Sequence, residues 1–306
     1  MKKCVVLFIT LIYCIESAYG IGRALLIGIG RYPTEQTGWK VIHGDADVTL
    51  LSPALHQQGF TDIKTLVNSQ ATKKAIVYEL KSLAARCQKG DKIYVHFSGH
   101  GQPIEDVNDD ELSEFDESII PYDAYRYAKN GYEGEKHLID DEYNLLLNSI
   151  KKKIGRDGVL FVAIDACYSR DMERGEEIDV EDPDIKSSAR GTDDKFLVKG
   201  HSAYLKNVPR PQRFAFGAKM YVVSACLETE RNYEHKTPSG KMYGSLSYYI
   251  FTLLKKDADF TRWAKCFDTK DYRRYHIFQT SQHHNITAQL QISVTYFCSI
   301  GLYFLV

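Results

Sequence analysis

The stretch Tyr94-Val-His-Phe-Ser-Gly-His-Gly101 indicates how this chain folds. Its β-branched and aromatic residues predict a buried strand that ends in a histidine and a glycine. A second stretch, Val159-Leu-Phe-Val-Ala-Ile-Asp-Ala-Cys167, has the same form and ends in a cysteine. Side chains just past the carboxyl ends of neighbouring parallel strands share one crevice. We therefore expect His100 and Cys167 to meet there.

A thiol beside an imidazole is an activated nucleophile, because the ring accepts or stabilises the proton and leaves a thiolate. The small neighbours Gly101 and Ala166 would let a substrate approach. Two other interpretations exist: a cysteine is often only a small buried hydrophobe, and His96 and His100 have the i, i+4 spacing of metal ligands. The glutamate of the HExxH motif is missing, however, and both candidates follow strands, which favours catalysis.

The composition is that of an ordinary globular protein. The chain has 306 residues, enough for one large domain or two small ones, and 44% of them are hydrophobic. The formal net charge of −1 gives no sign of a nucleic-acid partner.

The N-terminus has the features of a signal peptide over residues 1–20. A basic start precedes an apolar run at 4–15, and small residues lead to a cleavage site after Gly20. The run is too short to cross a bilayer, so we expect no stable membrane span. We expect export, to a periplasm or out of the cell. A lipoprotein at Cys14 is the weaker alternative, because a bulky tyrosine precedes that cysteine.

The cysteines after residue 20 predict neither a disulfide framework nor a zinc site. Their number is odd and no CxxC spacing occurs, which is compatible with one free reactive thiol. They are Cys87, Cys167, Cys226, Cys266 and Cys298.

Strand and helix patterns alternate along the chain, which predicts a doubly wound α/β sheet. One predicted helix begins at Asp140 or Asp141, either of which can serve as its cap. The predicted strands are 23–29, 63–67, 92–97, 159–167 and 220–225, and the predicted helices are 45–58, 71–87, a helix ending near 154, and 243–254.

Three segments break this alternation. Residues 103–121 are acidic and predict a solvated surface loop or hairpin whose carboxylates could also hold a cation. Residues 170–216 are charged and lack a regular pattern, as functional or disordered loops do. Residues 292–306 are almost wholly apolar, which leaves open a final strand, a weak membrane contact or a tail.

The motifs HFSGHG at 96–101 and DACYS at 165–169 resemble the paired signatures of caspase-fold cysteine peptidases. Asp165 stands where caspases have glutamine, which is the metacaspase form. Other segments resemble the bacterial metacaspase-like branch, and together the resemblance covers about 23–256. These are ALLIGI at 24–29, HGDADV at 43–48, QGF at 58–60, DE at 116–117, PYD at 121–123, LIDDE at 138–142, and VSAC at 223–226 followed by Glu234.

The resemblance implies a caspase-like three-layer α/β/α sandwich with a mostly parallel central sheet. The chain departs from the family's sequence pattern in two places. Tyr168-Ser169-Arg170 stands where His-Ser-Gly is commoner, and the match is poor after about Asp257. The implied division is a peptidase domain at 21–290, made of a large-subunit-like part at 21–170, a linker at 171–217 and a small-subunit-like part at 218–290, followed by an apolar tail at 291–306.

The resemblance also implies an exported cysteine endopeptidase. Cys167 would attack a peptide carbonyl as thiolate, and His100 would act as general acid and base. The backbone N–H groups of Gly101 and Cys167 would stabilise the oxyanion. A catalytically silent caspase-fold protein that binds peptides or partners, and a cysteine hydrolase of another kind, are the alternatives.

The substrate pocket is expected to be acidic. Asp47 and Asp165 match positions that are basic in caspases, and two carboxylates in a cleft favour a guanidinium or an ammonium. We therefore expect cleavage of peptides or proteins after Arg or Lys, including self-cleavage between about Lys186 and Lys199.

Calcium is a further expectation from the resemblance. Some metacaspases hold Ca²⁺ with acidic residues shortly after the catalytic strand, although no EF-hand spacing is present here. The acidic residues available in that segment are Asp179, Glu181, Asp182 and Asp184.

Overall fold

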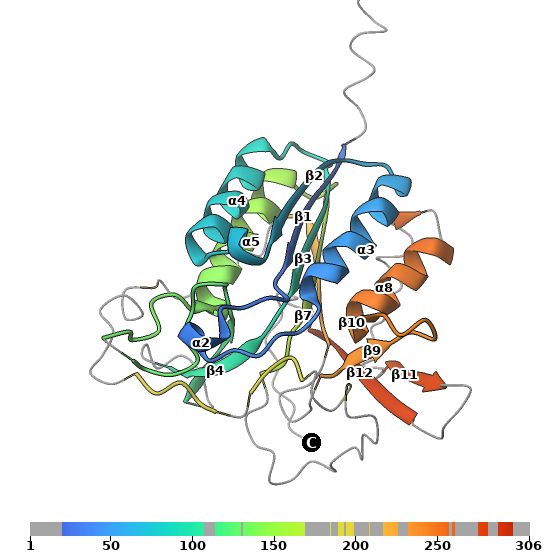
Figure 1. The fold of residues 1–306 in the computed structure, drawn as a ribbon. Coiled ribbons are helices and arrows are strands. Elements are labelled where there is room, and N and C mark those ends of the chain that lie inside the picture. The colour runs from blue at the N-terminus through green and yellow to red at the C-terminus, as the bar shows by residue number, and fades with distance from the viewer. Residues whose placement is uncertain are drawn as a thin grey trace, which may run out of the picture.

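The computed structural model is an α/β sandwich of three layers (Figure 1). Helices α3 and α8 cover one face of a central sheet, and α4 and α5 cover the other. The structure describes residues 20–106, 114–129, 131–168, 184, 189–192, 194–198, 208, 217–225, 232–256, 259–260, 275–280 and 287–295.

The central sheet is mostly parallel, as predicted. Its order is β11-β12-β8-β7-β3-β1-β2, in which the five strands from β8 to β2 are parallel, β12 pairs antiparallel with β8, and β11 pairs antiparallel with β12. The bounds are β1 Gly22–Gly28, β2 Phe60–Val67, β3 Lys92–Ser98, β7 Val159–Asp165, β8 Lys219–Ser224, β11 Tyr275–Thr280 and β12 Thr287–Thr295.

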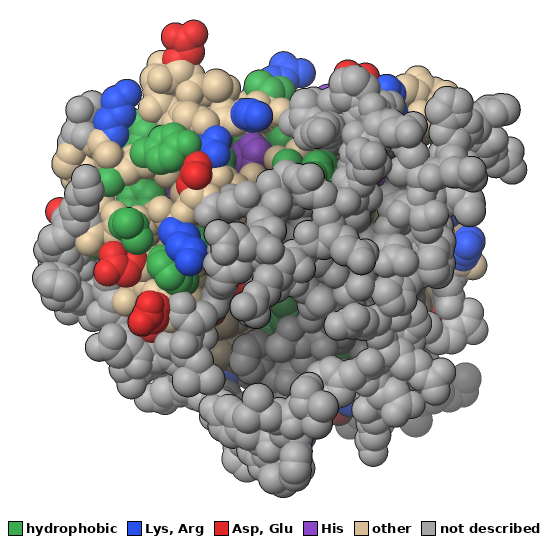
Figure 2. All heavy atoms as spheres, turned by 90° about the horizontal axis from the view of Figure 1, so that it is seen from below, with side chains coloured by type: hydrophobic (Ala, Val, Ile, Leu, Met, Phe, Trp, Pro, Cys, Tyr) green, Lys and Arg blue, Asp and Glu red, His purple; other side chains and the backbone are tan. Residues whose placement is uncertain are grey.

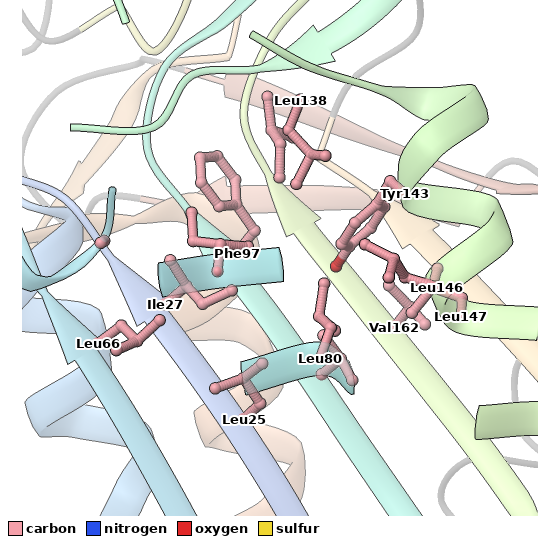
Figure 3. Packing of buried hydrophobic residues seen from close by; sticks show 14 of the residues in the cluster. Leu25, Ile27, Leu66, Leu80, Phe97, Leu138, Tyr143, Leu146, Leu147 and Val162 are labelled. Atoms are coloured by element: carbon pink, nitrogen blue, oxygen red, sulfur yellow. The ribbon is translucent and has the colours of Figure 1, made fainter. Parts of the chain in front are cut away.

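Both faces of the sheet are apolar because helices cover both. Side chains alternate along a strand, so Leu25 and Ile27 pack on the α4 and α5 side (Figure 3), whereas Ala24 and Leu26 pack on the α3 and α8 side. The helices that close these two cores are α3 Gly44–Gln57, α4 Lys73–Arg86, α5 Asp140–Ile154 and α8 Ser245–Lys256.

Two small sheets and two short helical turns complete the described part. The ends of the acidic segment pair antiparallel as β4 and β5, so they form a hairpin, and residues 107–113 lie outside the described residues. The elements are α2 Thr34–Thr37, the 3₁₀ turn η1 Asn68–Gln70, the sheet of β4 Gly101–Glu105, β5 Phe115–Ile119 and β6 Leu138–Ile139, and the pair β9 Glu234–Lys236 and β10 Met242–Gly244.

The structure corrects two details at element ends. Helix α5 begins at Asp140, and Ile139 holds the N-cap position without a side-chain hydrogen bond, so the prediction that an aspartate caps this helix is wrong. The acidic residues instead occupy the first turn, where the helix dipole favours negative charge. Strand β7 ends at Asp165, which places Cys167 in the connection that follows.

The two chain ends are described in part. Strand β12 reaches Thr295, so the first residues of the predicted apolar tail are extended, while 1–19 and 296–306 lie outside the described residues. No helix within the described ranges is long and apolar enough to span a membrane. The division into two subunit-like parts and a linker stays a prediction.

Candidate active site

Two adjacent strands deliver the predicted catalytic residues to one edge of the sheet. β3 pairs with β7 in parallel register, with Ser98 opposite Asp165, and the Gly99 N–H donates to the Asp165 carbonyl at 3.2 Å. His100 and Cys167 therefore leave the sheet from neighbouring strand ends at the same level. Figure 2 shows the molecule from this end, where hydrophobic, basic and acidic side chains lie on the described part of the surface.

The backbones of the two strand ends touch. A Cβ on Gly101 would lie 2.5 Å from the Cys167 carbonyl oxygen, so this approach requires glycine. Cys167 is 2% exposed and forms no disulfide within the described part of the chain.

The imidazole of His100 is fixed on three sides. Its ring stacks on Trp39 with centroids 4.9 Å apart and lies 5.0 Å from the ring of Tyr32. Nε2 lies 2.9 Å from the Lys40 carbonyl oxygen, which can only accept, so Nε2 carries the proton. Nδ1 is buried and has no hydrogen-bond partner among the described residues. In the neutral ring, Nδ1 is thus the nitrogen that accepts a proton.

The pKa of His100 is held at about 4. Burial is the main cause, and the positive charges of Arg190 and Arg126 act in the same direction, while the hydrogen bond to Lys40 opposes them. The ring is therefore neutral near pH 7 and ready to act as a base.

Both predicted oxyanion donors point at one oxygen atom. The Cys167 N–H lies 3.0 Å from the carbonyl oxygen of Arg190, and the Gly101 N–H lies 3.2 Å from it. Two backbone donors that converge on one carbonyl oxygen have the geometry of an oxyanion hole.

The Arg190 side chain is fully buried among carboxylates. Its Nη2 lies 2.6 Å from Glu234 Oε1 and 3.0 Å from Asp47 Oδ2, and its Nη1 lies 3.8 Å from Asp165 Oδ1. Nη1 also donates to the hydroxyl of Ser98. The structure thus brings the predicted Asp47 and Asp165 together around one guanidinium.

Each aspartate is held by polar groups of the protein. Asp47, in the first turn of α3, accepts from the Ser98 hydroxyl at 2.6 Å and from the Gly244 N–H at 2.9 Å. Asp165 accepts from Asn232 Nδ2 at 2.7 Å, and from the N–H and hydroxyl of Ser247 at 2.8 and 2.6 Å. Both carboxylates are therefore held in position by groups other than the Arg190 side chain.

Burial and the neighbouring charges shift the pKa values of the groups in this cluster. Burial, aided by nearby Asp165, raises the pKa of Asp47 to about 7, although Arg190 acts against the shift. Burial would also raise the pKa of Glu234, but Arg190 and His43 outweigh it and hold that pKa at about 2. For Arg190, burial favours the neutral form, and the three carboxylates more than compensate and raise its pKa.

Sequence reasoning missed part of this site. Glu234 matches a family motif in the sequence, but no spacing pattern connects it to Asp47. Ser98 lies inside the strand motif but has no local signature for pocket lining. The Lys40 carbonyl is a backbone group, which residue types do not reveal.

A metal is not indicated by the described residues. No group of three or more His, Cys, Asp or Glu within them could hold an ion. His96 uses both ring nitrogens in bonds of 3.0 Å to Tyr94 and Ser247. Of the acidic residues proposed for calcium, Asp184 is exposed and accepts from Lys236 Nζ at 2.8 Å, while 179, 181 and 182 lie outside the described residues.

Comparison with known proteins gives one consistent family. Residues 22–173 match the family model described as metacaspase, peptidase C14 domain. Metacaspase-1B of Aspergillus fumigatus is 34% identical over 163 residues, which cover 49% of this chain and 36% of that protein. Metacaspase-3 of Arabidopsis thaliana is 26% identical over 258 residues, which cover 79% of this chain and 61% of that protein. This chain thus spans less than two thirds of either relative.

A solved structure supports the fold alone. A protein from Geobacter sulfurreducens aligns with a TM-score of 0.53 and 18% sequence identity, over 77% of this chain and 82% of that one.

Proposed function

Because this chain belongs to the metacaspase family of caspase-fold cysteine peptidases, we propose that it is an endopeptidase that cleaves after Arg or Lys. Cys167 is the nucleophile, His100 is the general base and acid, and Asp47 and Asp165 line the pocket for the residue before the cut. Whether the chain falls in the bacterial branch stays a prediction.

One observation carries the proposal: Arg190 lies in the site as a substrate residue would. Its guanidinium is among the pocket carboxylates, and its carbonyl oxygen accepts from both candidate oxyanion donors. A side chain and a carbonyl of the same residue therefore satisfy two requirements of cleavage after a basic residue at once.

The proposed reaction assigns a role to each of these groups. His100 Nδ1 takes the proton of the Cys167 thiol, and the thiolate attacks the carbonyl carbon. The N–H groups of Gly101 and Cys167 stabilise the oxyanion, each by about 3 kcal/mol. The imidazolium then protonates the leaving amine as the peptide bond breaks and a thioester remains. Water, deprotonated by His100, hydrolyses the thioester and restores the thiol.

Self-processing is the direct consequence, and the bond it would cut is Arg190–Gly191. This bond lies within the segment from Lys186 to Lys199 that the sequence predicts. A Cβ on Gly191 would lie 2.2 Å from the Cys167 carbonyl oxygen and 2.8 Å from Cys167 Cβ. The chain thus passes directly along the residue that carries the nucleophile.

The test compares four forms of residues 21–306: the unaltered chain, Cys167→Ala, Arg190→Ala and Lys195→Ala. We expect a new N-terminus at Gly191 in the unaltered chain and in Lys195→Ala, the matched control, whose side chain lies over the Phe115 ring instead of in the pocket. Cys167→Ala should stay one chain, and Arg190→Ala should lose this cut.

A panel of fluorogenic peptides varied before the scissile bond completes the test. Turnover of Arg and Lys peptides by the unaltered protein, absent in Cys167→Ala, is the expected result. Preference for Asp, or equal nicking of the Cys167→Ala form, would overturn the proposal.

We also propose export with removal of residues 1–20. The Ile21 nitrogen lies 2.9 Å from Asp91 Oδ1, so cleavage after Gly20 would leave a charged amino group facing a carboxylate. N-terminal sequencing of protein recovered outside the cytoplasm should begin at Ile21. A chain that keeps residues 1–20 would contradict export.

A further inference from the structure

We propose that the outer edge of β4 binds the residues that follow the scissile bond. It selects an acidic side chain four positions after the cut and a large aromatic side chain six positions after it. This inference rests on the proposed function, because the segment after Arg190 represents the substrate beyond the cut. The pocket carboxylates receive the residue before the cut and are not part of this second site.

Strand β4 lies at the edge of its small sheet, and the segment after Arg190 runs parallel to it. β4 pairs with β5 on one side. On its other side two parallel bridges join it to the segment, Gly101 with Gly191 and Ile104 with Phe196. Backbone hydrogen bonds flank the second bridge, from the Phe196 N–H to the Pro103 carbonyl at 2.8 Å and from the Glu105 N–H to the Phe196 carbonyl at 3.0 Å. Peptides that add to an edge strand gain affinity from such bonds, and side-chain pockets give specificity.

A fully buried glutamine holds the backbone between the two bridges. The bridged residues are 101 and 104 on β4 but 191 and 196 on the segment, so the segment bulges away from the strand. Gln102 Nε2 reaches across and donates to the Asp194 carbonyl at 2.8 Å and to the Arg126 carbonyl at 3.0 Å. Its Oε1 accepts from His137 Nε2 at 3.0 Å, which fixes the amide. The edge thus presents a preset donor to a backbone carbonyl four positions after the cut.

Arg126 and Tyr127 converge on the side chain at this fourth position. Nε and Nη2 of Arg126 lie 3.1 and 2.6 Å from Asp194 Oδ2, and the Tyr127 hydroxyl donates to the same oxygen at 2.8 Å. Three donors directed at one oxygen favour a carboxylate and disfavour an ammonium. The Arg126 guanidinium also lies over the ring of Trp39, which stacks on His100. This subsite therefore adjoins the proposed general base.

The side chain at the sixth position fills an aromatic pocket. The Phe196 ring is 2% exposed, and its centroid lies 4.6 Å from that of His137 and 5.5 Å, edge to face, from that of Tyr132. Both nitrogens of His137 are hydrogen-bonded, to Tyr132 and Gln102, so neither is left unpaired against the phenyl ring. A Cβ on Gly134 would lie 3.2 Å from the same ring. The pocket therefore fits a large, flat, apolar side chain closely.

The experiment measures kcat/KM for quenched fluorogenic peptides with the sequence of residues 187–198, in which glutamine replaces Lys195 so that one basic residue remains. One peptide carries asparagine instead of aspartate at the fourth position, and two others carry leucine or alanine instead of phenylalanine at the sixth. Residues 191–198 of the protein itself would compete equally with every peptide, so the ratios between peptides are unaffected.

Two variants test the acidic preference from the side of the protein. Arg126→Glu reverses the charge that faces the fourth position. Arg31→Glu is the matched control, because this exposed arginine follows β1 at the same edge of the central sheet and pairs with Asp45 at 3.5 Å instead. It shows how much of any effect comes from the general field at this edge.

We expect asparagine at the fourth position to lower kcat/KM of the unaltered protein by about three- to tenfold, since a charged hydrogen bond at a partly exposed site is lost. Arg126→Glu should prefer asparagine to aspartate, and Arg31→Glu should keep the original preference. Alanine at the sixth position should lower kcat/KM by about tenfold or more, because the buried ring is lost, and leucine should lower it less. The peptide series decides the question even if Arg126→Glu does not fold.

The outcomes separate the two proposals. If the unaltered protein cleaves none of these peptides, the proposed function itself is wrong. If it cleaves all of them at equal rates, whatever residue stands at the fourth and sixth positions, the proposed function stands and β4 is not a substrate-binding edge.

Discussion

His96 lies in strand β3, and His100 lies four positions further on, in the connection that follows this strand. The two histidines differ in the hydrogen bonds of their ring nitrogens. Both rings are fully buried, and burial is the main cause that lowers the pKa of each to about 4. Both ring nitrogens of His96 are hydrogen-bonded, to Tyr94 and Ser247. His100 bonds the Lys40 carbonyl through Nε2 and leaves Nδ1 without a partner in the described part of the chain.

The comparison teaches that neither burial nor pKa distinguishes the structural His96 from His100, the histidine that we propose to be catalytic. The distinguishing feature is a ring nitrogen that has no partner among the described residues and lies just past a strand end. Such a nitrogen costs stability, and the proton transfer that we propose for His100 would account for it.

The largest expected effect separates the two histidines directly. His100→Ala should lower kcat by about 10²–10⁴-fold, the usual contribution of a general acid–base, with little change in melting temperature. His96→Ala should do the reverse, because it leaves the buried Tyr94 hydroxyl without its hydrogen-bond partner, at about 1–3 kcal/mol, while the Ser247 hydroxyl keeps its bond to Asp165. Peptide turnover and thermal melts of both variants measure this.

A His100→Ala protein with full turnover would remove the catalytic assignment. A His96→Ala protein that is as stable as the unaltered chain would show that the two hydrogen bonds of His96 contribute nothing to stability. The structural role of His96 would then be wrong.

The two aspartates of the pocket give the next effect. Asp47→Asn and Asp165→Asn should each lower kcat/KM for Arg and Lys peptides by at least about tenfold. Both variants should also lower the melting temperature, because in each an amide nitrogen replaces a buried carboxylate oxygen that accepts hydrogen bonds. Unchanged kcat/KM in both variants would show that the pocket does not select by charge.

Much of the fold was predictable because it depends on local pattern. Apolar runs predicted β3 and β7, and helical spacing predicted α4 to within two residues at its start. The placement of His100 and Cys167 at neighbouring strand ends followed from the rule for parallel sheets.

The rest depends on contacts between distant parts of the chain. The position of Arg190 is set by bridges that pair Gly101 with Gly191 and Ile104 with Phe196, which no periodicity reveals. Glu234, in β9, lies beside Asp47 and Arg190, where the backbone N–H and the ring of His43 contact its carboxylate. The basic linker predicts that some Arg or Lys lies near the carboxylates, but that this residue is Arg190 is visible only in the tertiary structure.

The smallest expected effect is on acid stability, measured in the Cys167→Ala background to prevent self-cleavage. The pKa values of His96, His100 and His137 are lowered by burial, to about 4, 4 and 3. Between about pH 6 and 5 the unfolded chain binds protons at these sites and the folded chain does not. Each site therefore lowers the free energy of unfolding by up to about 1.4 kcal/mol per pH unit as the pH falls.

Asp47 opposes this trend, because burial and Asp165 raise its pKa to about 7 and the folded chain binds the extra proton there. The net slope from pH 6 to 5 should thus correspond to about two protons instead of three. Adding Asp47→Asn removes the opposing group, so urea unfolding at pH 6.0, 5.5 and 5.0 should show a steeper loss of stability than Cys167→Ala alone. Identical slopes in the two proteins would mean that Asp47 is already ionised in the folded state, and the electrostatic description of the pocket would have to change.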